Sequence, residues 1–191
     1  MELTSREGWT VVHGLVLGTV FLLTFGGGLA GLWSLRPGFI TAKGIKERMT
    51  RLYIGTSTMA VVAWLTVISG TWIVYPWYRA GLAGAGDDPY AGCTGLALPS
   101  DTCSPRDFLK SNVSGTTETW HNFGMEWKEH IGWAAPILAT AAAFLVIYYG
   151  PRLIARPWLR AAVIVMFVGA FAAAVVGGVF GAFLNKVAPI V

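Results

Sequence analysis

Charge is scarce in this sequence: Asp, Glu, Lys and Arg make up only 13% of the 191 residues, whereas hydrophobic residues make up 54%. A typical soluble domain carries about 25% charged residues. The deficit is concentrated in four stretches that contain no charged residue, namely 8–35, 52–78, 130–151 and 161–185. Each stretch is longer than the roughly 20 residues that a helix needs to cross the hydrocarbon layer. We therefore expect an integral membrane protein, and a water-soluble enzyme is excluded.

The absence of charge inside these stretches also narrows the function. Ion-coupled transporters, proton relays and voltage sensors depend on ionisable residues in the membrane interior, so these classes are not expected. The only cysteines are Cys93 and Cys103, and no C-x-x-C-H run occurs, which excludes covalent attachment of a c-type haem. No glycine-rich phosphate loop is present, and the hydroxyl residues of the second stretch have no histidine in the same span. An intramembrane hydrolase is therefore not expected either.

The predicted fold is all-α: one four-helix membrane bundle covering 1–191, with spans at about 9–35, 52–78, 130–150 and 161–185. Glycines four residues apart recur in the first and last spans, and small residues at this spacing let helix backbones approach closely. Tight packing within the bundle is the simplest interpretation of these glycines.

Most of the basic residues lie in the two short connections, at Arg36, Lys43, Lys46, Arg48, Arg51, Arg152, Arg156 and Arg160. Such a concentration marks the cytoplasmic side of a membrane protein and indicates lipid rather than nucleic acid as the partner. Both termini and the long 79–129 connection are then extracytoplasmic, with the connection forming a cap over the bundle. This topology suits a multi-pass protein of a bacterial inner membrane. Cys93 and Cys103 would lie on the oxidising side, which favours a disulfide between them.

Histidine supplies the main lead to function. His13 lies about one turn inside the first span and His130 opens the third span. Since both spans enter the membrane from the same side, the two imidazoles are expected at a similar depth. Two imidazoles on different helices of a bundle can hold a haem iron axially, and the haem propionates would then face Lys128, Arg79 or Lys186. Either histidine alone would be an ordinary interfacial side chain.

His121 leaves alternatives open, because it precedes His130 by nine residues. On a continuous helix this separation places the two rings on opposite faces. His121 can replace either haem ligand, hydrogen-bond a propionate, or be a solvated loop residue. A copper or zinc site that combines His121 and His130 with Glu126 or Glu129 is a further possibility.

At this point the chain resembles small four-helix membrane cytochromes of the b type, and uncharacterised four-span bacterial membrane proteins whose first and third spans open with histidine. The resemblance rests on His13-Gly14, on Glu129-His130-Ile131-Gly132 and on Val176-Gly177-Gly178. It covers the spans but not the 79–129 connection. What it implies is a b-haem electron-transfer subunit with His13 and His130 as the ligands.

Three histidines cannot supply two bis-histidine haems, so a single haem near the outer face is expected. Such a subunit would exchange electrons with quinol, with a periplasmic carrier or with a partner subunit, and would at most be the redox subunit of an oxidoreductase complex. The alternative function is a cofactor-free accessory subunit, packed against a larger respiratory or photosynthetic membrane complex.

Overall fold

The computed structural model describes residues 5–39, 44–75 and 119–187, and all of its regular structure in these ranges is helical. Four helical segments are long and apolar enough to cross a membrane: Gly8–Ser34, Gly44–Val74, Trp120–Leu153 and Pro157–Leu184. The expectation of an all-α fold with four helices able to span a membrane is thereby confirmed. Both cysteines and most of the 79–129 connection lie outside the described residues, as do the chain ends.

Several segments are composites of shorter helical elements. In chain order the elements are α1 (Ser5–Val11), η1 (Val12–Val16), α2 (Leu17–Ser34), η2 (Pro37–Phe39), α3 (Gly44–Ser69), η3 (Gly70–Val74), η4 (Trp120–Gly124), α7 (Met125–Ile131), α8 (Ala134–Tyr149), η5 (Gly150–Leu153) and α9 (Pro157–Val187). Of these, η1, η3 and η4 are single π-helical turns, whereas η2 and η5 are 3₁₀ turns.

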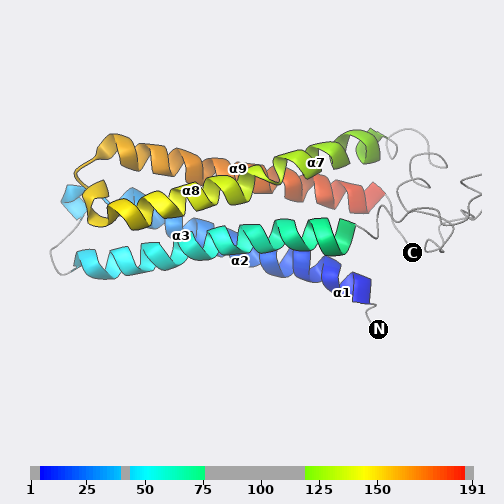
Figure 1. Cartoon of the computed structure of the whole chain (residues 1–191), viewed down its shortest axis with the longest axis horizontal. Helices are drawn as coiled ribbons and strands as arrows, with labels where there is room; N and C mark the ends of the chain where they lie inside the picture. Colours follow the sequence, from blue (N-terminus) through cyan, green and yellow to red (C-terminus); the bar gives the residue numbers. More distant parts are fainter. Residues whose placement is uncertain (1–4, 40–43, 76–118, 188–191) are drawn as a thin grey trace, which may run out of the picture.

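The four segments form a four-sided bundle in which neighbouring segments run in opposite directions (Figure 1). Helix α2 packs against α3, α3 against α8, α8 against α9, and α9 against α2. Helix α1 begins and α9 ends at one end of the bundle, which we call the histidine end because His13, His121 and His130 lie there. The opposite end holds the end of α2, the beginning of α3 and residues 150–156, and we call it the loop end.

Small residues bring the helices together in the middle of the bundle. The side chain of Phe167 is fully buried against Gly28, where a β-carbon would lie only 2.6 Å from the Phe167 ring. On the same α2–α9 contact, the rings of Phe25 and Phe171 stack with centroids 4.0 Å apart. In lipid there is no hydrophobic driving force between helices, so helix association depends on van der Waals contacts between closely packed backbones. Gly28 therefore sets the distance between α2 and α9.

Arginines at the loop end satisfy the free carbonyl groups of two helix C-termini. Arg160 donates to the backbone oxygen of Leu35, and Arg48 donates to that of Ser34 at 3.4 Å. Arg152 donates to the backbone oxygen of Tyr148 at 2.8 Å, at the end of α8. The last carbonyl groups of a helix lack intrahelical donors and carry partial negative charge, which attracts cations. These basic residues therefore stabilise helix ends.

The third membrane segment begins ten residues earlier than the sequence indicates, at Trp120 rather than at 130. The reason is aromatic packing, because the Trp120 ring stacks on Phe183 of α9 with centroids 4.9 Å apart.

The third membrane segment bends between α7 and α8. Pro136 has no N–H to offer the carbonyl group of Gly132, so the helical hydrogen bonding is interrupted there.

Candidate functional site

The histidine end of the bundle contains irregular, π-helical turns. All three π-helical turns among the described residues, η1, η3 and η4, lie there, and His13 and His121 are members of two of them. A π-helical turn inserts an extra residue into a helix, and such turns occur frequently at functional sites. This end of the bundle is therefore where we look for chemistry.

His13 reaches from η1 to the last turn of α3. Its Nδ1 lies 3.0 Å from the Ser69 hydroxyl, and that hydroxyl donates its own proton to the backbone oxygen of Thr66 at 3.1 Å. We assign the ring hydrogen to Nδ1, because a Ser69 hydroxyl that donates to Thr66 leaves its oxygen as the acceptor of the ring N–H. The partly buried imidazole therefore presents the lone pair of Nε2.

Gly70 lies against the Cε1 atom of the His13 ring, between its two nitrogens. A β-carbon at position 70 would lie 2.8 Å from Cε1 and 3.4 Å from Nε2 of His13. Contacts under 3.0 Å require something to shift, so glycine is the residue that accommodates the ring. The absence of a β-carbon at position 70 therefore lets the ring pack directly against the end of the second segment.

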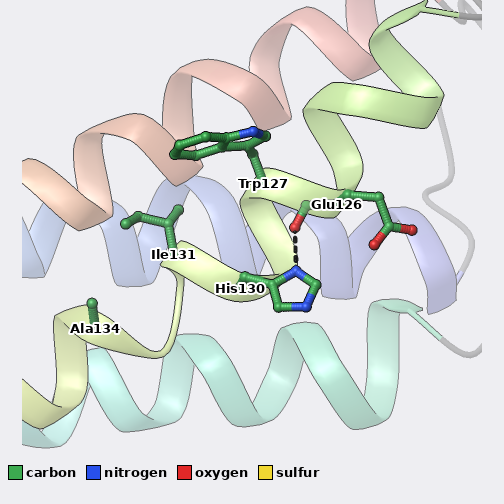
Figure 2. Close-up of a pocket in the computed structure, with 5 residues that line it drawn as sticks. All are labelled: Glu126, Trp127, His130, Ile131 and Ala134. Atoms are coloured by element: carbon green, nitrogen blue, oxygen red, sulfur yellow. Dashed lines mark hydrogen bonds between the residues drawn. The ribbon is translucent and has the colours of Figure 1, made fainter.

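His130 has a similar hydrogen bond on a different helix. Its Nδ1 lies 2.7 Å from the backbone oxygen of Glu126, one turn earlier in α7 (Figure 2). A carbonyl group only accepts, so Nδ1 is again the protonated nitrogen and Nε2 holds the lone pair. The ring is exposed and lines a surface pocket of about 390 Å³, together with Trp127, Ile131 and Ala134.

The structure thus places His13 and His130 at the same end of the bundle but in different surroundings. His13 is partly buried between the first and second segments, whereas His130 is exposed on the third. No hydrogen bond joins the two rings in the part of the chain that the structure describes. What they share is the protonated Nδ1, which leaves both Nε2 atoms as potential ligands of a metal.

His121 lies in different surroundings from His130. Its exposed fraction is 3%, whereas His130 is exposed. The expectation of a copper or zinc site built from these two histidines and Glu126 or Glu129 is wrong, because residues 5–39, 44–75 and 119–187 contain no group of three potential ligands. The physical reason is that the helix directs the two rings to opposite faces.

Sequence reasoning missed the residues that support His13. Ser69 resembled the other hydroxyl residues of its span, which bond back to their own helix, and Gly70 resembled any packing glycine. Their position at the end of the second span, at the depth expected for His13, was the only available signal. Comparison of the chain with protein-family models, curated proteins and solved structures gives no match.

Proposed function

We propose that this protein is a membrane electron-transfer subunit that carries one b-type haem near the histidine end, and that His13 and His130 would hold its iron. The observation that supports the proposal is the hydrogen bonding of the two rings. Each donates Nδ1–H to an oxygen, His13 to Ser69 and His130 to Glu126. Metal-ligating histidines almost always donate their other ring N–H to such a partner, which orients the ring and raises its basicity.

The local geometry of His13 also supports the proposal. Gly70 accommodates the ring at the end of the second segment, and the ring comes from a π-helical turn, a feature that is frequent at functional sites. His130 lies beside apolar pocket residues, Trp127 and Ile131, that suit the edge of a porphyrin. His121, which is buried at the same end, is the alternative second ligand.

A haem of this kind supplies reversible one-electron transfer. With a single haem close to one end, the subunit would not pass electrons across the full membrane. It would exchange them with quinol, with a soluble carrier outside the membrane, or with a partner subunit of an oxidoreductase complex. The protein's own contribution is to hold the ring nitrogens in the correct tautomer and to keep the site within an apolar bundle.

The orientation of the bundle belongs to the same proposal. The loop end carries Arg36, Arg48, Arg152, Arg156 and Arg160, and positive charge in short connections marks the cytoplasmic side. The histidine end and both termini would then face the periplasm of a bacterial inner membrane. A periplasmic location of the haem agrees with electron exchange in the outer leaflet.

The test is spectroscopic. We expect full-length protein purified in mild detergent from haem-replete cells to show a Soret band and sharp bands on dithionite reduction, with one haem per chain by pyridine haemochromogen assay. His13→Ala and His130→Ala should each abolish these bands, whereas His121→Ala should retain them. All three variants remove one imidazole from the same end of the bundle, so they control for each other.

Other outcomes lead to definite conclusions. Loss of haem in His121→Ala with retention in His130→Ala would make His121 the second ligand. A colourless wild-type protein that also fails to bind added hemin would refute the haem proposal. A colourless protein that co-purifies with a partner at fixed stoichiometry would identify the alternative function, a cofactor-free accessory subunit.

A further inference from the structure

The loop end of the bundle is rich in arginine and poor in acidic residues (Figure 1). Glu47 is the only acidic residue in 8–86 and in 130–191, and it forms an ion pair with Arg51 of the same helix, α3. The connection between α8 and α9 therefore has no acidic residue of its own to neutralise its basic side chains. Two of these side chains, Arg152 and Arg156, are exposed.

Both exposed arginines lie against one tyrosine ring. The guanidinium carbon of Arg156 lies 5.4 Å from the centre of the Tyr149 ring, and that of Arg152 lies 5.8 Å from the same centre. Tyr149 itself packs against the hydrophobic core, so the fold determines where the two cations lie. Like charges held close together repel each other. An anion bound by both guanidinium groups would offset this repulsion.

The Arg152 guanidinium is oriented by the end of α8. Its Nε donates to the backbone oxygen of Tyr149 at 3.3 Å, and its Nη2 donates to that of Tyr148 at 2.8 Å. These bonds use one edge of the guanidinium group, and Nη1 can still donate to a ligand. A guanidinium group fixed in this way loses little further conformational freedom when it binds an anion.

Exposed aromatic rings indicate the depth of this arginine pair in a membrane. Tyr148 is exposed at the end of α8, and Trp158 is 70% exposed in the first turn of α9. At the end of α2, the exposed Trp33 ring lies 4.1 Å from the guanidinium carbon of Arg36. Tyrosine and tryptophan concentrate where the hydrocarbon layer meets the lipid headgroups. The arginine pair would therefore lie at the level of the lipid phosphates.

An apolar surface continues from this position along α8. The Phe144 and Tyr148 rings stack with centroids 5.9 Å apart, and both rings are exposed. Ile147, beside them on α8, is 56% exposed. The same region of the helix therefore offers cations at its end and an apolar surface next to them, which suits a ligand with an anionic head and an apolar tail.

We propose that Arg152 and Arg156 bind the phosphate of an anionic phospholipid, whose acyl chains lie along α8 at Phe144 and Ile147. Guanidinium groups match phosphate oxygens with paired N–H donors. A zwitterionic headgroup brings its own cation to the site, so a phospholipid with net negative charge is preferred. The inference is independent of the proposed haem, because it concerns the opposite end of the bundle.

Native mass spectrometry of the full-length protein in detergent measures this preference. Stepwise binding of phosphatidylglycerol is compared with that of phosphatidylcholine carrying the same acyl chains, and the wild type should bind phosphatidylglycerol more tightly. One arginine at an anionic lipid surface contributes about fivefold in affinity. The double variant Arg152→Gln/Arg156→Gln should therefore bind phosphatidylglycerol about 25-fold more weakly than the wild type, with phosphatidylcholine binding unchanged.

Arg51→Gln is the matched control. It removes one positive charge from an exposed arginine of the same end, but this arginine pairs with Glu47 and not with the Tyr149 ring. Phosphatidylglycerol affinity should stay at the wild-type value in Arg51→Gln. An equal loss in Arg51→Gln and Arg156→Gln would mean that general positive charge attracts the lipid, and it would overturn the proposed site. Competition by inorganic phosphate at the concentration of the lipid would also overturn it, because the ligand would then need no acyl chain.

The single variant Arg156→Gln separates lipid binding from helix stability, because Arg152→Gln also removes two hydrogen bonds at the end of α8. Arg156→Gln should lose about fivefold in phosphatidylglycerol affinity and keep a melting temperature close to that of the wild type in lipid-free detergent. Arg156→Lys should recover part of the affinity, since lysine keeps the charge but lacks the planar pair of donors. Equal phosphatidylglycerol affinities of the wild type and the double variant would refute the inference.

Discussion

Replacing Ser69 with alanine tests the hydrogen bond on which the proposed role of His13 depends. The Ser69 hydroxyl accepts from Nδ1 of His13 at 3.0 Å and donates to the Thr66 backbone at 3.1 Å. A hydrogen bond of this kind contributes about 1 kcal/mol net, which corresponds to roughly a fivefold change in the ratio of the two neutral tautomers. We therefore expect Ser69→Ala to shift His13 toward the Nε2–H form, which cannot coordinate iron through Nε2.

Histidine-selective ¹⁵N NMR of the apo-protein in detergent micelles measures this ratio directly, with the His13 signals assigned from their absence in His13→Ala. Haem affinity provides a second measurement, and loss of such a supporting hydrogen bond typically weakens metal binding by about 10- to 100-fold. Ser69→Thr keeps the hydroxyl and should restore both properties. The control is Ser34→Ala, because Ser34 also donates to a carbonyl three residues earlier but lies at the loop end.

Two results would refute this reasoning. One is a wild-type spectrum in which Nδ1 of His13 carries no hydrogen. The other is a Ser69→Ala protein with an unchanged tautomer ratio. Either result would remove the observation that supports His13 as a ligand, whether or not haem binds elsewhere.

The remaining predictions concern packing and orientation. Gly28→Ala should lower the free energy of unfolding by about 1–3 kcal/mol, because its β-carbon would lie 2.6 Å from the Phe167 ring. Gly27→Ala is the control and should have little effect on stability, because its added β-carbon meets nothing within 4 Å. The free energies of unfolding of the two variants are compared by tryptophan fluorescence during denaturation. Equal stability of the two variants would contradict the packing argument. A cysteine at the exposed position Lys46, placed in a variant without native cysteines, should react with a membrane-impermeant maleimide only in inverted vesicles. Labelling in intact cells would show that the topology is the opposite of the proposed one.

Part of the candidate site was accessible from sequence patterns. The placement of His13 in the first helical segment and of His130 in the third follows from where the uncharged stretches begin. Helical periodicity predicts that His121 and His130 lie on opposite faces, and the structure has His121 buried and His130 exposed. What periodicity does not supply is the rotation of one helix relative to another. For that reason Ser69 was not recognised as the partner of His13.

Local composition determined the broad architecture. Four long stretches without charge are sufficient to specify four membrane-spanning helices, because a backbone in hydrocarbon must satisfy its own hydrogen bonds. Contacts between distant segments decided the rest. The third segment starts at Trp120 because that ring packs on Phe183 of α9, and Lys128 enters the bundle because α9 presents glycine at position 181. These features depend on side chains more than 50 residues apart along the chain, so only the packed bundle brings them together.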